Sequence, residues 1–271
     1  MHEGVLKRNN VKVFGHGTQP MLFAHGFGCD QHMWRFLTPA FEDRYRIVLF
    51  DYVGSGKSDK TAYDPNRYGE LTGYAQDVLD ICEALQLTNT IFVGHSVSSM
   101  IGLLAAIQQP RYFDQLILIG PSPRYLNDQP GYFGGFEQAD IDELLSLMDH
   151  NFIGWANSLA PAIMGNADRP GLGKELTDSF CSTDPVIMQQ FARATLLSDN
   201  RRDLSYLQIP ALILQCADDI IAPQPVGEYM HQHLPKSTLR YMKATGHCPH
   251  MSAPTETIEL MDDYLTHAMV A

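Results

Sequence analysis

Cysteine is scarce in this chain of 271 residues, which has only five. The number is odd, and the two cysteines nearest in sequence, Cys216 and Cys248, are 32 residues apart. This spacing argues against a dense disulfide framework and against a zinc knuckle. The opening segment MHEGVLKRNN also lacks the apolar stretch of a secretory signal peptide. We therefore expect a protein of a reducing compartment, the cytoplasm.

Long apolar runs and basic charge are also lacking. The longest run of apolar residues and glycine covers 100–107, eight residues, whereas about 20 are needed to cross a bilayer. The chain has 19 Lys and Arg against 31 Asp and Glu, for a net charge of −12. This charge repels phosphate backbones and anionic lipid surfaces. We therefore expect neither a membrane span nor a nucleic-acid partner.

Apolar side chains, in contrast, are abundant enough to form a large core. Hydrophobic residues make up 45% of the chain and charged residues 18%, a composition that excludes intrinsic disorder. The length fits one domain with a large insertion. We therefore expect a single domain over residues 1–271.

Strand signals alternate with helical periodicity along most of the chain. Runs rich in β-branched and aromatic residues lie at 11–14, 21–25, 46–50, 90–94, 116–119, 211–215 and 238–242. This alternation predicts an α/β fold with a mostly parallel central sheet flanked by helices. Between Ile119 and Ala211 the strand signals stop, and helical stretches at 138–150, 151–164 and 185–197 replace them. We therefore predict a core of residues 1–122 and 205–271, with a helical cap inserted at about 123–204.

The segment Gly94-His95-Ser96-Val97-Ser98 lies where a predicted strand leads into a helix-compatible stretch. This is the context of a nucleophile elbow, the sharp turn that exposes a catalytic serine in the pattern G-x-S-x-G. The turn needs small residues, because strand and helix approach closely there. Gly94 meets this need, and Ser98 stands in place of the second glycine. Ser96 is therefore the candidate nucleophile; the alternative is an ordinary serine in a polar turn.

An acid and a histidine follow in the order that a catalytic triad takes on such a sheet. Asp219 follows the predicted strand at 211–215, and His247 lies in a loop after the strand at 238–242. A serine hydroxyl is a poor nucleophile until a neutral imidazole accepts its proton, and a buried carboxylate fixes the imidazole tautomer. We therefore expect His247 to be the base and Asp219, which apolar residues follow, to be the acid. Asp218 is the alternative acid.

Acyl-transfer chemistry also needs donors for a developing oxyanion, usually two backbone N–H groups. Val97, directly after the candidate nucleophile, supplies one. The glycine-flanked Phe27, after the predicted strand at 21–25, is the expected second donor; the alternative is an ordinary strand-end turn. His231 and His233 are two residues apart on a predicted helix and face different ways, so they do not form a metal pair. We expect neither a metal nor an organic cofactor.

Five motifs together resemble the α/β-hydrolase family. They are H-G-F-G at 25–28, D-Y-V-G-S-G-K-S-D at 51–59, G-H-S-V-S at 94–98, C-A-D-D-I-I-A-P at 216–223 and G-H-C-P-H at 246–250. Within that family the chain is most similar to the RsbQ-type bacterial stress-response regulators and, more distantly, to plant strigolactone and karrikin receptors. The resemblance implies the α/β-hydrolase fold, a four-helix cap and an enclosed, mainly apolar pocket above the nucleophile. It carries Ser96, Asp219 and His247 over as the triad, and Phe27 and Val97 as oxyanion donors.

Two hypotheses about function follow from these residues and this resemblance. The first is a serine hydrolase of small hydrophobic esters or lactones that serves stress signalling, as in RsbQ-like proteins. The second is a ligand receptor whose cap binds another protein, such as a PAS-domain phosphatase. The same triad can also transfer an acyl group to peroxide. Phe136, Trp155 and Phe191 either line the pocket or fill the core of the cap.

Overall fold

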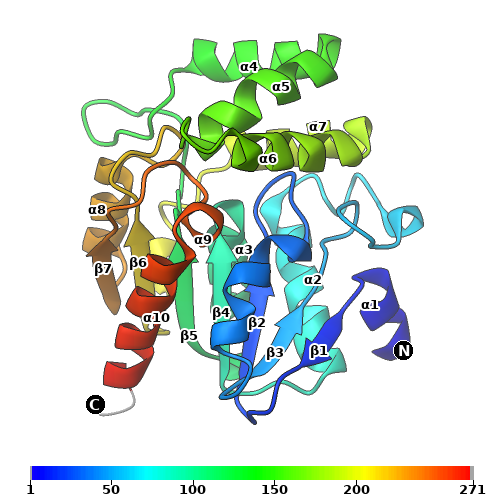
Figure 1. Ribbon diagram of the computed structural model, residues 1–271, viewed down its shortest axis with the longest axis vertical. Coiled ribbons are helices and arrows are strands. Elements are labelled where there is room, and N and C mark those ends of the chain that lie inside the picture. The colour runs from blue at the N-terminus through cyan, green and yellow to red at the C-terminus, as the bar shows by residue number, and fades with distance from the viewer. Residues whose placement is uncertain (1, 269–271) are drawn as a thin grey trace.

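A seven-stranded sheet forms the middle of the molecule, and helices cover both of its faces (Figure 1). The computed structural model describes residues 2–268. The strands are β1 (Lys12–Phe14), β2 (Pro20–Ala24), β3 (Arg46–Leu49), β4 (Thr90–His95), β5 (Phe113–Ile119), β6 (Ala211–Gln215) and β7 (Ser237–Tyr241). Their order is β1-β3-β2-β4-β5-β6-β7; β1 pairs antiparallel with β3, and the other neighbours pair parallel. The predicted mostly parallel sheet is confirmed, and each predicted strand position holds a strand.

The helices around the sheet pack on two separate apolar cores. They are α1 (His2–Arg8), α2 (Leu71–Ala84), α3 (Val97–Gln108), α8 (Gln224–His233), α9 (Pro249–Ser252) and α10 (Pro254–Ala268), with short 3₁₀ helices at Gln31–Phe36, Thr38–Ala40, Lys60–Ala62, Pro110–Tyr112 and Leu204–Tyr206. Met21 and Phe23 of β2 share one core with α10, whereas Leu22 and Ala24 face the other core with α2 and α3. This alternation follows from the two-residue period of a strand, and burial on both faces explains why β2 is apolar throughout.

Four further helices form a layer of their own, which we call the cap. They are α4 (Gln138–His150), α5 (Phe152–Met164), α6 (Pro170–Ser182) and α7 (Pro185–Leu196). They follow β5 and precede β6, and they lie together across one end of the sheet, at the top of Figure 1. The four-helix cap of the predicted fold is therefore confirmed. The exact limits of the inserted segment stay a prediction.

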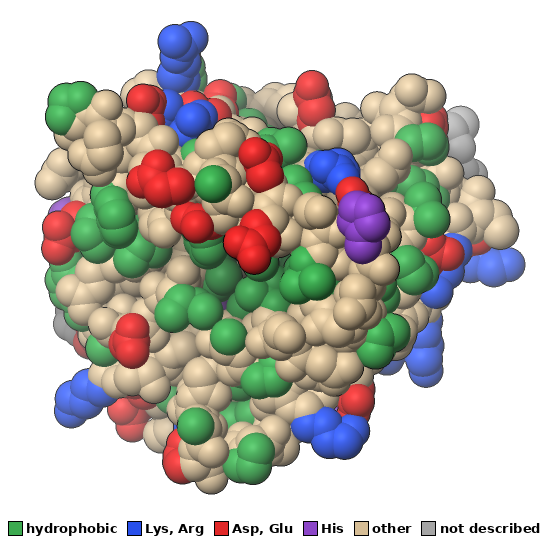
Figure 2. All heavy atoms as spheres, turned by 90° about the horizontal axis from the view of Figure 1, so that it is seen from above, with side chains coloured by type: hydrophobic (Ala, Val, Ile, Leu, Met, Phe, Trp, Pro, Cys, Tyr) green, Lys and Arg blue, Asp and Glu red, His purple; other side chains and the backbone are tan. Residues whose placement is uncertain are grey.

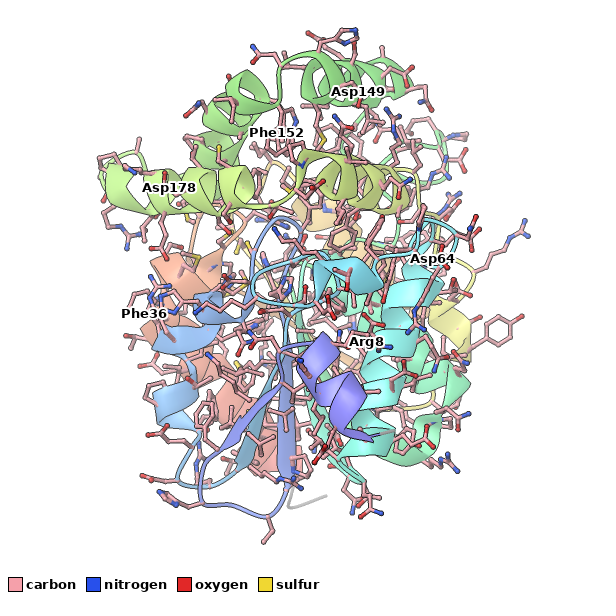
Figure 3. All side chains as sticks on the ribbon, turned by 90° about the vertical axis from the view of Figure 1, so that its right-hand side faces the viewer. Arg8, Phe36, Asp64, Asp149, Phe152 and Asp178 are labelled. Carbon is pink, nitrogen blue, oxygen red and sulfur yellow. The ribbon has the colours of Figure 1, made fainter. Side chains whose placement is uncertain are left out.

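The outer face of the cap is rich in acidic side chains. Residues 138–196 contain eight Asp and Glu but three Lys and Arg. Figure 2, which looks onto the molecule from above, shows several acidic side chains gathered on one part of this face. Figure 3 shows the two layers from the side, with Asp149, Phe152 and Asp178 in the cap and Arg8, Phe36 and Asp64 in the layer below.

Strands β4, β5 and β6 end beneath the cap at the same edge of the sheet. In the register of the sheet, His95 at the end of β4 pairs with Ile119 at the end of β5, which in turn pairs with Leu214 of β6. The loops that follow these strands therefore begin at one edge of the sheet, where α/β folds usually bind their ligands. Within residues 2–268, no helix has the length and apolar character needed to span a membrane.

Candidate active site

Ser96 lies at the turn between β4 and α3, in a strained backbone conformation. Its φ of 56° and ψ of −124° fall outside the regions that a residue with a side chain normally adopts. Its N–H donates to the carbonyl oxygen of Ile119 at 2.8 Å, which holds the turn against β5. Gly94 is required here because a Cβ at that position would lie 2.7 Å from the carbonyl oxygen of Ser98. The segment thus has the geometry of a nucleophile elbow.

Ser98, which departs from the usual glycine of the elbow, has a packing role of its own. The side chain is fully buried, and its hydroxyl donates to the carbonyl oxygen of His25. The hydroxyl of Tyr52 lies 2.9 Å from the Ser98 hydroxyl oxygen and donates a hydrogen bond to it, because the Ser98 proton is already used. A serine in this place therefore ties the first turn of α3 to the loop that follows β2.

Three side chains from distant parts of the chain form one line of hydrogen bonds. Ser96 Oγ lies 2.7 Å from Nε2 of His247, and Nδ1 of His247 lies 2.7 Å from Oδ2 of Asp219. The other oxygen of Asp219 accepts the N–H groups of Ile221 at 2.8 Å and Ala222 at 3.0 Å. Because an ionised carboxylate only accepts, Nδ1 must carry the proton, which leaves Nε2 free to accept the proton of Ser96. The arrangement can activate a serine hydroxyl.

Asp219, and not Asp218, is the acid that meets His247. Burial by itself raises the pKa of the Asp219 carboxyl, but the electrostatic interaction and hydrogen bond with His247, together with the two backbone donors, outweigh burial and hold that pKa below its usual value. Asp219 is therefore ionised at neutral pH. The side chain of Asp218 is exposed, and its backbone oxygen accepts the N–H of Gly246 at 2.6 Å. Asp218 thus positions the histidine loop through its backbone.

Two further histidines lie behind His247 and stay neutral. Burial lowers the pKa of His95 to about 3, and the electrostatic interaction with the nearby His247 ring adds to the effect. Burial also lowers the pKa of His250 well below its usual value. His95 donates from Nε2 to the carbonyl oxygen of His247 at 2.7 Å, and its ring lies 4.4 Å from that of His250. These rings therefore support the histidine loop without adding a positive charge beside His247.

Because His250 is buried in its neutral form, we expect the protein to lose stability in mild acid. A substitution that removes this histidine should make the loss smaller. The unfolded chain takes up a proton on His250 near pH 6.5, whereas the folded protein does not, so stability falls as the pH decreases. In His250→Phe, the loss of unfolding free energy between pH 7.5 and 5.0 should be smaller than in the wild type by about 2 kcal/mol. Urea unfolding at the two pH values measures this difference. The control is His32→Phe, at an exposed position, which should keep the wild-type pH dependence. If His250→Phe lost as much unfolding free energy between the two pH values as the wild type, the account would be contradicted.

The two expected oxyanion donors, Phe27 and Val97, lie on segments that are held together. The loop with Phe27 is tied to α3 by the bond between Ser98 and His25, and Gly26 packs so closely on His95 that a Cβ there would lie 2.4 Å from its Nδ1. Within the described part of the chain, neither the N–H of Phe27 nor that of Val97 has a hydrogen-bond acceptor. Both groups can therefore bind a ligand oxygen, and the N-terminus of α3 adds a favourable dipole.

Ser96 and His247 open onto an apolar cavity of about 70 Å³ between the sheet and the cap. Its cap side includes Leu144, Met148, Trp155, Leu159, Phe180 and Leu196. Two of the expected pocket residues, Phe136 and Trp155, line this cavity. Phe191 does not, because its ring stacks on Tyr74 at 4.3 Å and packs beneath Phe27 at 5.5 Å. The cavity suits a small apolar ligand rather than a large one.

Tyr125 is a residue of the site that the sequence did not reveal. It lies in the loop between β5 and the cap, is almost fully buried, and lines the cavity beside Ser96, with which its hydroxyl interacts. Burial raises the pKa of this hydroxyl more than the contact with Ser96 lowers it, so Tyr125 stays neutral. No motif marks this position, because tertiary packing alone brings the loop over the serine. Across the residues that the structure describes, no cluster of three His, Cys, Asp or Glu could hold a metal ion.

Comparisons with known proteins agree with this geometry. The family model described as the alpha/beta hydrolase fold matches residues 19–254. The strigolactone esterase RMS3 of Pisum sativum is 39% identical over 98% of this chain and 96% of its own length. The karrikin insensitive 2 receptor CA of Petunia hybrida is 38% identical over 97% of each chain. Among solved structures, a hydrolase from Oleispira antarctica is 45% identical, with a TM-score of 0.96 over 98% of this chain and 97% of its own.

Proposed function

Because the chain belongs to the α/β-hydrolase family, we propose that it is a serine hydrolase of small hydrophobic esters or lactones. The observation that carries this proposal is the line of hydrogen bonds from Ser96 through His247 to Asp219, which opens onto an apolar cavity. Relatives named as strigolactone esterases support an ester or lactone as the substrate class.

In the proposed mechanism, Ser96 carries the acyl group between two steps. Nε2 of His247 accepts the serine proton while Oγ bonds to the substrate carbonyl carbon, and the N–H groups of Phe27 and Val97 stabilise the oxyanion. The carbon–oxygen bond to the alcohol then breaks, and the alcohol takes the proton from His247. In the second step His247 accepts a proton from water, the resulting hydroxide attacks the acyl-serine, and the serine regains its proton. Asp219 stabilises the imidazolium in both steps.

The small cavity predicts a preference for short acyl chains. A series of p-nitrophenyl esters from acetate to decanoate tests it: we expect kcat/KM to be highest for chains of up to about six carbons and at least about tenfold lower for decanoate, since steric exclusion of a few methylenes costs roughly that much. A γ-lactone of similar size should also be hydrolysed. If the protein hydrolysed none of these compounds, the proposed activity would be contradicted.

A second candidate function is that of a ligand receptor whose cap binds another protein. Relatives named as karrikin insensitive 2 receptors favour it, and so does the acidic outer face of the cap (Figure 2). An RsbQ-like role in stress signalling, with a PAS-domain phosphatase as the partner, is the specific form we propose for it. The exposed Asp142 and Glu143 of α4 separate the two functions: exchanging both for Lys should spare ester hydrolysis and remove partner binding. The five cysteines, free in the structure, suit a cytoplasmic setting for either function.

A further inference from the structure

The last turn of α5 contacts the histidine loop, which we define as residues 242–248 between β7 and α9. A helix leaves its last four carbonyl oxygens without a partner inside the helix. In α5, the carbonyl oxygen of Ile163 accepts the backbone N–H of His247 at 2.9 Å. The carbonyl oxygen of Met164 accepts the side-chain amide of Asn166, also at 2.9 Å. The end of a cap helix is therefore bonded directly to the backbone of the proposed base.

Two glycines allow the cap and the histidine loop to approach closely. Gly246, directly before His247, has a φ of 80°, and a Cβ there would overlap the carbonyl oxygen of Met164. Gly165, directly after α5, has a φ of 61°, and a Cβ there would lie only 3.2 Å from Cα of Gly246. The backbones of the two segments therefore pack in direct contact, with no room for a side chain between them.

Asn166, between α5 and α6, joins the two segments through its amide group. Its Nδ2 donates to the carbonyl oxygen of Met164 and, at 3.0 Å, to that of Thr245 in the histidine loop. Its Oδ1 accepts from Arg169, which also donates to the carbonyl oxygen of Ser252 at 2.6 Å. Because Nδ2 faces two acceptors and Oδ1 faces a donor, these partners fix the orientation of the amide.

Bonds from the core hold the same loop on its other side. The carbonyl oxygen of Asp218 accepts the N–H of Gly246 at 2.6 Å, and His95 donates to the carbonyl oxygen of His247 at 2.7 Å. A catalytic side chain must be held within about 0.5 Å of its productive position. The bonds from the core and the bonds from the cap together provide this precision for the imidazole.

We propose that Asn166 is a positioning residue, which acts on the reaction through the histidine loop. Its amide ties Thr245 to the end of α5 and thereby keeps His247 within reach of Ser96. This inference rests on the proposed function, because it concerns the base of the same reaction. Asn166 is not among the described residues that line the cavity. Loss of the amide should therefore slow the chemical steps and leave substrate binding nearly unchanged.

Two substitutions remove the amide donor without straining the backbone. The φ of Asn166 is 55°, a left-handed conformation that glycine adopts freely and aspartate tolerates. Asn166→Gly removes the side chain, whereas Asn166→Asp keeps its shape but turns a carboxylate toward two carbonyl oxygens. We expect each variant to lower kcat on a short p-nitrophenyl ester by about tenfold, with KM changed by less than about twofold, since small displacements of a catalytic group act on the chemical step.

Asn89 provides the matched control. It has the same backbone conformation, with a φ of 54°, and it is exposed directly before β4, at the end of that strand away from Ser96. Asn89→Gly should keep both kcat and KM. If the Asn166 variants raised KM and kept kcat, the amide would merely support the cavity wall and the assignment would be overturned. Wild-type values of both constants would overturn it equally.

An NMR measurement tests the position of His247 without any substrate. The proton on Nδ1 lies in the buried 2.7 Å hydrogen bond to Asp219 and should give a strongly downfield signal, which isotope-labelled histidine assigns. Asn166→Gly should shift this signal or broaden it through faster exchange with water, whereas Asn89→Gly should not. An unchanged signal in Asn166→Gly would overturn the inference. A changed signal in a protein that hydrolyses no ester would support the positioning role and count against the hydrolase function alone.

Discussion

Replacing Ser96 by Ala should reduce ester hydrolysis by a factor of about 10⁴ or more, measured as kcat/KM on a short p-nitrophenyl ester. Without Oγ no acyl-serine can form, and only the oxyanion donors and substrate positioning remain, which together give a small residual rate in serine hydrolases. The variant should fold normally, because Ser96 Oγ bonds to His247 and not to the backbone that holds the turn.

A second buried serine provides a control for nonspecific effects of the substitution on the fold. Ser122, like Ser96, is buried, but its hydroxyl donates to the carbonyl oxygen of Arg124 at 2.9 Å. Ser122→Ala should therefore keep the rate within a few-fold. If Ser96→Ala kept a substantial part of the activity, another nucleophile would have to act. Cys29 and Cys248 line the same cavity, but burial raises the pKa of Cys29 to about 12 and that of Cys248 well above its usual value, so neither is a thiolate at neutral pH.

Replacing Asp219 by Asn should lower kcat/KM by roughly 10³ to 10⁴, whereas Asp218→Asn should change it by less than about threefold. The reason lies in the tautomer of His247. Ionised Asp219 accepts the proton on Nδ1, which leaves Nε2 as the acceptor facing Ser96. An Asn amide that turned its NH₂ toward Nδ1 would favour the opposite tautomer and no longer stabilise the imidazolium.

The two variants Asp219→Asn and Asp218→Asn are a well-matched pair. The two residues are adjacent in sequence, yet the side chain of Asp218 is exposed and that of Asp219 is buried against His247. Equal losses in the two variants, or a larger loss in Asp218→Asn, would show that the acid had been assigned to the wrong residue. Thermal unfolding of both proteins would show whether a loss arises from stability instead of chemistry.

The sheet could be predicted from the sequence because each strand is short, apolar and bounded by turn residues. In β2, for example, side chains on both faces are buried, and the continuous apolar run reflects this directly. The fourth helix of the expected cap, α6, could not be located from helical periodicity, because its first turn, Pro-Gly-Leu-Gly, contains two glycines. Packing against α5 stabilises it in spite of this low propensity.

The candidate site likewise contains some residues that the sequence could predict and others that it could not. Ser96, Asp219 and His247 could be predicted because each follows a recognisable strand, so their meeting depends only on sheet topology. The cavity wall depends on how the cap packs, which no local pattern encodes. Phe191 therefore lies beside Tyr74 and not in the wall, and Tyr125 was not identified. Which wall residues meet a ligand is decided by contacts between elements far apart in sequence.

The most direct test of the central claim is covalent labelling of Ser96. The wild type is incubated with a small serine-directed phosphonate, intact mass is recorded, and the modified peptide is sequenced by fragmentation. The account predicts one adduct, on Ser96, with no adduct on Ser96→Ala and much slower labelling of Asp219→Asn. An adduct on another residue, or a wild-type protein that stays unlabelled while it is folded, would contradict Ser96 as the activated nucleophile.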